Sequence, residues 1–216
     1  MIRLIKQDAS TNIERLDRRL LTEPSIALTG VLATTKVQLV ELLYYIKGLI
    51  RESEQQKIDF VNLQVVLDDT HAFVDLIHLD SQHKPQWSRL VTIIHILDHM
   101  QRLHERCSER RSLKQLLEHK PELDSAIATL NQDINVLAEM ILHDEWQKAF
   151  KIAESCRNNL TQLAEPVRHE IMTDIAEGGF TVPEATAHLE ALRWLQRIMN
   201  HVFRISFHLK QLKTIE

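Results

Sequence analysis

The chain has 216 residues, of which 44% are hydrophobic and 26% charged, the balance of a soluble globular protein rather than of a disordered tail. Its 26 basic and 30 acidic residues give a net charge of −4, which argues against a partner such as nucleic acid or an anionic membrane. Only four Gly and five Pro are present, too few for the frequent turns of a sandwich, a barrel or a doubly wound sheet. The composition therefore predicts an all-α protein built from long helices.

Apolar residues recur at spacings of three and four through the first half of the chain, which predicts three long amphipathic helices. The first begins at the start signal Thr22-Glu23-Pro24, where a capping hydroxyl precedes an acid and a proline, and it runs to about Arg51. The second covers about residues 58–79. The third begins at Pro85 and continues through Leu103.

The second half of the chain repeats this organisation, with helices predicted over about 123–143, 146–177 and 183–210. Pro166 falls inside the middle helix, where a proline can kink the backbone. Gly178-Gly179 then supplies a stop, because glycine takes the left-handed conformation without a Cβ penalty. The segment Thr181-Val182-Pro183-Glu184 has the spacing of a capping box and predicts the start of the last helix.

Two features bear on what these helices bury. Trp87, Trp146 and Trp194 lie in apolar helical patterns and are predicted to be core anchors. The most apolar window, residues 37–50, is interrupted by polar side chains, so no helix is expected to be apolar enough to span a membrane.

Residues 87–106 and 189–208 align without a gap at an offset of 102. Within this alignment the Asp98/Asn200, His99/His201 and Arg102/Arg204 pairs keep their polar character, which helical patterning alone does not require. The match predicts an internal repeat and hence two tandem three-helix bundles of six long antiparallel helices. Residues 1–21 would form an N-terminal linker, 22–118 the first bundle and 119–216 the second.

The segments at the centre of this repeat carry a resemblance. Residues 195–201 (LQRIMNH) and 93–99 (IIHILDH) both resemble the L-E-R-I-G-D-H stretch of the PhoU family. Residues 16–28 and 191–197 resemble the PhoU-like cytoplasmic domain at the C-terminus of bacterial sodium/phosphate cotransporters, where a segment like 16–28 links the last membrane helix to the bundle. The resemblance implies the two-bundle PhoU-like fold.

The same resemblance implies a non-catalytic regulatory and interaction domain for phosphate transport. It places the chain on the cytoplasmic side, associated with the membrane through a transporter domain outside this chain. The implied partner is a phosphate transporter membrane domain or a transport or signalling complex, with a homodimer as a further option and no nucleic acid. The alternatives are a stand-alone cytosolic PhoU-like adaptor of phosphate signalling and a metal-binding helical bundle, either a sensor or an oxidoreductase.

The polar positions of the repeat are the predicted partner surface. They would act by coupling, because a bundle with two packing arrangements biases a transporter only if it contacts the two transport states with different free energies. The six predicted residues are Asp98, His99, Arg102, Asn200, His201 and Arg204.

The PhoU family's metal clusters use acidic residues at i and i+4, and here the matching pairs are Ile94/Asp98 and Gln196/Asn200. Only one of these four positions is a carboxylate, and neutral amides cannot offset the desolvation of a transition metal as carboxylates do. The inherited metal site is therefore predicted to be lost, and no cofactor is expected.

A different divalent metal site remains as an alternative. His95, Asp98 and His99 fall within one helical turn, and imidazoles at i and i+4 can bind zinc. Asp68 or His71 from the second helix could add a ligand. Chance also explains such pairs, because the chain contains twelve histidines.

No motif predicts catalysis. The chain contains no phosphate-cradling glycine loop, nucleophile elbow or locally supported Cys-His arrangement, so an enzyme is not expected. Cys107 and Cys156 are too few and too far apart for a disulfide scaffold or a zinc pattern, and they are predicted to be small core thiols in a reducing cytosol.

Overall fold

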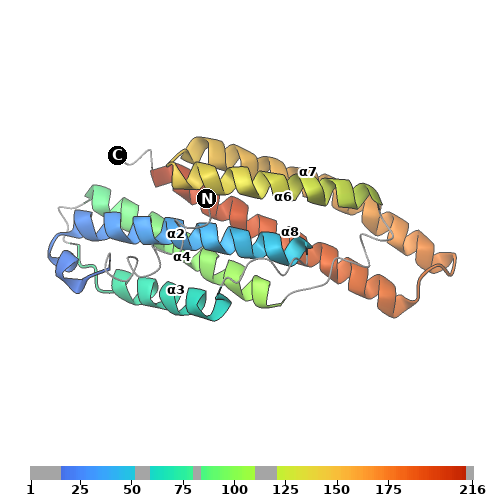
Figure 1. The fold of residues 1–216 in the computed structure, drawn as a ribbon, viewed down its shortest axis with the longest axis horizontal. Helices are drawn as coiled ribbons and strands as arrows, with labels where there is room; N and C mark the ends of the chain where they lie inside the picture. Colours follow the sequence, from blue (N-terminus) through green and yellow to red (C-terminus); the bar gives the residue numbers. More distant parts are fainter. Residues whose placement is uncertain (1–15, 52–58, 80–83, 110–120, 213–216) are drawn as a thin grey trace.

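A computed structural model describes residues 16–51, 59–79, 84–109 and 121–212 and confirms the all-α fold. Within those ranges the chain forms six α-helices, preceded by one short 3-10 helix, and contains no strand (Figure 1). The elements are η1 (Arg18–Thr22), α2 (Pro24–Arg51), α3 (Phe60–Val74), α4 (Lys84–Ser108), α6 (Pro121–Leu142), α7 (Trp146–Ala176) and α8 (Val182–Leu212).

The helix starts and stops follow the local sequence closely. At the start of α8, the backbone N–H of Thr181 donates to Glu184 Oε2 at 2.8 Å and the Glu184 N–H donates to Thr181 Oγ1 at 3.4 Å, which confirms the capping box. Gly178 has a φ of 78° just after α7, so the left-handed stop is confirmed. Pro166 lies inside α7 without ending it.

One predicted cap is wrong. Helix α2 does begin at Pro24, but Thr22 belongs to η1, and its hydroxyl donates backwards to the Arg19 carbonyl at 3.0 Å. Asp17 caps η1 instead, because its carboxylate accepts from the Arg19 backbone N–H at 2.9 Å. The hydroxyl therefore closes a turn ahead of α2.

Five of the six helices pack as a ring, and the sixth, α3, lies outside it. Helices α2 and α4 contact each other, α4 contacts α8, α8 contacts α7, α7 contacts α6, and α6 returns to α2. Helix α3 covers α2 and α4 (Figure 1). The first helices of the two sequence halves, α2 and α6, therefore meet, and so do the third helices, α4 and α8.

The buried side chains of all six helices form one continuous cluster. Helices α2 and α4 bury apolar residues against α3 and also against α6 and α8. The contacts of α2 with α6 and of α4 with α8 join the two halves. The structure thus confirms six helices around a core but does not confirm two separate bundles, and the division at residues 118 and 119 stays a prediction.

Two predictions were wrong, one about the burial of Trp87 and one about the apolarity of α2. Trp146 and Trp194 are core residues, at 7% and 3% exposed, but Trp87 is 46% exposed on α4. By length and composition α2 is apolar enough to cross a membrane, because an 18-residue window within Pro24–Ile50 has a mean hydropathy of 1.5. Just over half of that apolar window is buried inside the structure, and the core helix of a bundle meets the same criterion.

Candidate functional site

The candidate site lies where α4 packs against α8, which we call the histidine seam: His95, His99, His201 and His208. The two helices run antiparallel, as two contacts of the same register show (Figure 1). The rings of His99 and His201 are tilted by 52° to each other with centroids 5.7 Å apart, and the Trp194 indole N–H donates to the Arg106 carbonyl at 2.7 Å. This register sets equivalent positions of the repeat opposite each other at His99 and His201.

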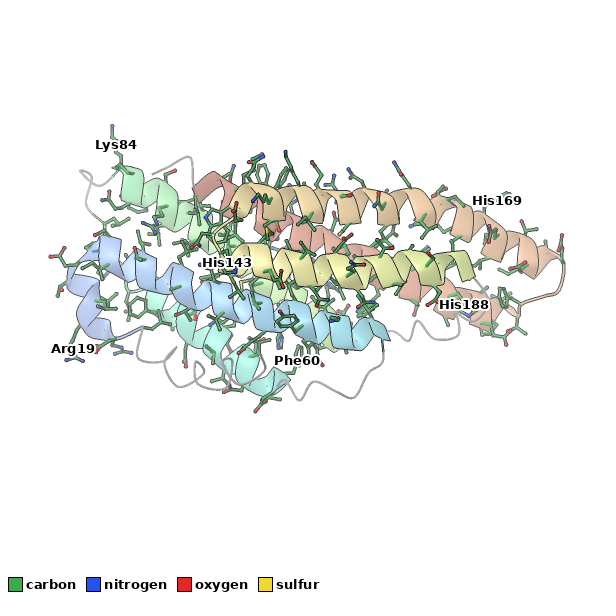
Figure 2. All side chains as sticks on the ribbon, turned by 45° about the horizontal axis from the view of Figure 1, so that its top comes forward. Arg19, Phe60, Lys84, His143, His169 and His188 are labelled. Atoms are coloured by element: carbon green, nitrogen blue, oxygen red, sulfur yellow. The ribbon has the colours of Figure 1, made fainter. Side chains whose placement is uncertain are left out.

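The imidazole rings form a row along the seam. His208 stacks on His95 with centroids 5.1 Å apart and on His99 with centroids 5.7 Å apart. His99 in turn meets His201, so every ring in the row contacts at least one other. Two exposed histidines belong to other parts of the chain: His143 lies in the turn after α6, and His169 lies on α7 (Figure 2).

Partial burial in the seam lowers the pKa values of His99, His201 and His208. The pKa of His99 is lowered to about 4, chiefly by burial. The adjacent His201 also lowers this pKa, and its effect is larger than the opposing effect of Asp98. Burial also lowers the pKa of His201, helped by the charges of Arg102 and Arg106. The Nδ1 atoms of His99 and His201 are buried and have no hydrogen-bond partner among the described residues.

His208 extends the seam in a direction that the sequence analysis missed. Burial lowers the pKa of His208, although the hydrogen bond between its Nδ1 and Gln211 Oε1, 3.0 Å long, opposes the shift. His208 lies seven residues after His201 on the same face of α8, and this spacing is a signal that could have found it. Residue 208 aligns with Arg106 in the first half. His208 helps to lower the pKa of His99, and Arg106 helps to lower the pKa of His201.

The predicted partner residues fall into three environments. Asp98 and Arg102 form an i,i+4 ion pair on α4, with Nε and carboxylate oxygen 3.2 Å apart and both side chains about half exposed. Arg204 is exposed beside His208, whose pKa its charge helps to lower. Asn200 is exposed too, but it faces a groove toward α7 and away from the seam. Of the six predicted residues, the structure therefore brings together His99 and His201, the central histidines of the seam, and leaves the other four at the surface.

No three His, Cys, Asp or Glu side chains in the described ranges are arranged as they would be around a metal ion. His95 and His99 do share a neighbour, but that neighbour is His208 on α8 and not the predicted Asp68 or His71 on α3. At the inherited position, Ile94 is 44% exposed and Gln196 Oε1 accepts a 2.7 Å hydrogen bond from Arg168. Gln196 thus already has a partner on α7.

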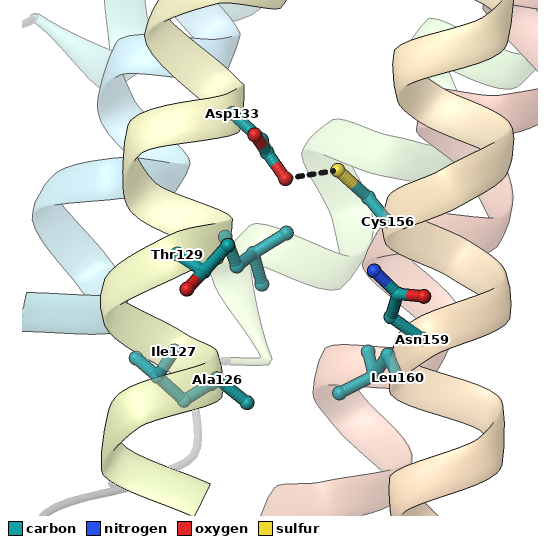
Figure 3. A pocket seen from close by; sticks show the side chains of 8 residues that line it. Ala126, Ile127, Thr129, Asp133, Cys156, Asn159 and Leu160 are labelled. Atoms are coloured by element: carbon teal, nitrogen blue, oxygen red, sulfur yellow. Dashed lines mark hydrogen bonds between the residues drawn. The ribbon is translucent and has the colours of Figure 1, made fainter.

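A second cavity, of about 180 Å³, lies between α6 and α7 and contains the one thiol with a polar partner in the described part of the chain (Figure 3). Cys156 Sγ donates to Asp133 Oδ2 at 3.4 Å. Burial and the Asp133 carboxylate raise the pKa of Cys156 to about 12, so the sulfur stays protonated and weakly nucleophilic. Cys107 is buried as well, and both cysteines are free thiols as predicted.

The fold and the seam together define an all-α, six-helix protein in which two similar helices pack through paired histidines. The chain matches no protein-family model, no curated protein and no solved structure. Its function is therefore argued from its own residues and from the resemblance carried by residues 93–99 and 195–201.

Proposed function

We propose that the chain is a non-catalytic, PhoU-like regulatory domain that acts by contact in phosphate uptake, resembling the cytoplasmic domain of a sodium-dependent phosphate cotransporter. The observation that supports this proposal most is the meeting of His99 with His201, 5.7 Å apart, at equivalent positions of the repeat. The two segments that resemble the PhoU family are thus the two that pack together. A duplicated chain whose halves face each other in this way has an approximate two-fold relation.

Regulation by contact requires a surface that distinguishes two states of the partner. Asp98, Arg102 and Arg204 lie beside the seam with side chains half-exposed or more, and Asn200 lies on the α7 side of α8. Together they offer charge and hydrogen bonds for that purpose. The histidine rings beside them pack α4 against α8 in one arrangement. A shift of α4 against α8 would therefore change the relative positions of the polar residues that the partner meets.

Charge reversal at two equivalent positions tests the proposal. Arg102→Glu with Arg204→Glu is expected to alter sodium-dependent phosphate uptake in the source cells at least several-fold, because both cations flank the proposed surface. Arg18→Glu with Lys151→Glu, which reverses two exposed charges away from the seam, is the matched control. Unchanged uptake in the first variant, with normal folding by circular dichroism, would contradict the proposed surface.

A stand-alone cytosolic adaptor is the alternative within the same class, and cell fractionation separates the two. An immunoblot band well above the 25.2 kDa of this chain in the membrane fraction would favour a transporter domain. A soluble band near 25 kDa would favour the adaptor.

A metal-binding bundle is the candidate from another class, and the stacking of His208 on both His95 and His99 is the observation that favours it. Coordination would require these rings to rotate, because stacked imidazoles do not direct their nitrogens at a common point. Elemental analysis of protein purified without chelator tests this candidate, since less than about 0.1 metal per chain would exclude stoichiometric binding.

A further inference from the structure

The surface between α7 and α8 holds a basic groove whose arginines none of the proposals above uses, although Asn200 also lines it. Its volume is about 230 Å³, and three arginines line it: Arg157 from α7, and Arg193 and Arg197 from α8. Thr161, Gln196 and Asn200 add polar groups, while Leu160 and Met199 are buried and form its apolar floor. No carboxylate is among the described residues that line the groove.

This concentration of positive charge is unexpected in a chain whose net charge is −4. Arg193 and Arg197 are at i and i+4 on the same face of α8, a spacing at which like charges destabilise a helix. Neither arginine has a hydrogen-bond or ion-pair partner in the part of the chain that the structure describes. Two cations at a mutually repulsive spacing without a counter-ion from the protein are suited to an anion from outside it.

The third arginine is held in place. The guanidinium carbon of Arg157 lies 3.8 Å from the centroid of the Phe203 ring, and its Nε and Nη2 both donate to Asn158 Oδ1. These contacts leave its Nη1 without a partner among the described residues and reduce the side-chain entropy that binding would cost. The nearby Glu165 is paired with Arg168 at 2.9 Å, so it does not neutralise the groove.

We propose that the groove formed by Arg157, Arg193 and Arg197 is a binding site for a phosphate oxyanion, either free phosphate or the phosphate of a lipid headgroup. Guanidinium groups match tetrahedral oxyanions through paired N–H donors, and three of them can share the oxygens of one phosphate. The groove is open and partly solvated, so the expected Kd for inorganic phosphate is on the order of 1 mM. This inference does not depend on the proposed regulatory function.

Thermal unfolding at constant ionic strength tests the site, with inorganic phosphate replacing chloride. Phosphate is expected to raise the Tm of the wild type in proportion to the logarithm of its concentration above Kd. Arg193→Gln with Arg197→Gln is expected to unfold at a higher temperature than the wild type without phosphate, because the repulsion is gone, and to lose the phosphate response. Arg18→Gln with Lys151→Gln removes two exposed positive charges elsewhere and is expected to keep that response.

Two further measurements identify the source of the phosphate. NMR titration with inorganic phosphate is expected to shift the side-chain Nε–Hε signals of the three arginines. Co-sedimentation compares phosphatidylglycerol vesicles with phosphatidylcholine vesicles. Arginine shifts that saturate without vesicle binding support free phosphate, and anionic-vesicle binding lost in the Arg193→Gln/Arg197→Gln variant supports a headgroup. Equal phosphate responses in the wild type and in that variant, together with no vesicle binding, would overturn the proposal.

Discussion

His99 and His201 are 102 residues apart in the chain, are aligned when residues 87–106 are matched with 189–208, and have ring centroids 5.7 Å apart. When two similar helices pack antiparallel, most contacts join residues that are not aligned in sequence. Aligned residues meet at only one position along the contact, and in this protein that position is a histidine in each helix. The two central residues of the seam, His99 and His201, are titratable. Burial and neighbouring basic side chains lower the pKa of both, which favours the neutral imidazoles.

Acidification is expected to destabilise the fold through this seam. The pKa of His99 is about 4 in the folded chain and about 6.5 when unfolded, so between these values the unfolded state binds more protons and stability falls as pH falls. Above about pH 6.5 the residue is neutral in both states and contributes no pH dependence. Because His99 is partly exposed, the expected loss is about 1 kcal/mol rather than the value given by the full shift.

Urea unfolding of the wild type and of His99→Leu at pH 7 and pH 4.5 measures this effect. The variant is expected to lose less stability than the wild type on acidification, since it has no proton to gain at this position. His169→Gln, which removes an exposed histidine on α7, is expected to keep the wild-type difference. Equal losses in the wild type and His99→Leu would show that the seam does not govern the acid response.

The tryptophan between α8 and the end of α4 is expected to be a key core contact. Trp194→Phe removes the indole N–H that donates to the Arg106 carbonyl at 2.7 Å and leaves that acceptor without this partner. The expected cost is about 1–3 kcal/mol in the free energy of unfolding. Trp87→Phe is the matched control, because Trp87 is 46% exposed, and its expected effect is within about 0.5 kcal/mol. A larger loss from the control than from Trp194→Phe would refute this ranking.

The start of α8 is expected to depend on its capping box. Thr181→Ala removes both the hydroxyl that donates to Glu184 Oε2 at 2.6 Å and the oxygen that accepts from the Glu184 backbone. We expect a loss of about 1 kcal/mol in chemical denaturation. Thr186→Ala deletes a hydroxyl that bonds only the Val182 carbonyl within the helix and should change stability much less. Similar losses for the two variants would mean that the cap contributes nothing particular.

Cys156 is expected to resist thiol reagents in the native state. Its pKa of about 12 leaves almost no thiolate at pH 8, so alkylation by iodoacetamide should be at least tenfold slower than in the urea-unfolded chain. Asp133→Asn removes the carboxylate that helps to raise this pKa and should speed the native reaction, while burial keeps it slower than in the unfolded chain. Native labelling of wild-type Cys156 at the unfolded rate would contradict the burial seen between α6 and α7.

The local sequence was sufficient for the helix boundaries that have their own signal, whereas the second helix, predicted to run to about residue 79, ends at Val74. The capping box at Thr181, the left-handed Gly178 and the apolar spacing of α4 all act within a few residues, and the structure confirms each of them. Local reasoning failed at Thr22, whose hydroxyl was free to close a preceding 3-10 turn, and at Trp87, whose position in an apolar pattern did not show that α4 turns this residue toward solvent.

The sequence by itself determined the all-helical class and the six helices, since period and capping are properties of neighbouring residues. Only the tertiary structure decided that α4 packs on α8, because helix contact depends on how apolar faces from distant segments fit together. That packing brought His208 to His95 and His99, and it gathered Arg157 with Arg193 and Arg197 across α7 and α8. Both clusters join side chains from separate helices, so spacing along α8 could group the α8 members of each cluster but could not bring them to their partners on α4 or α7.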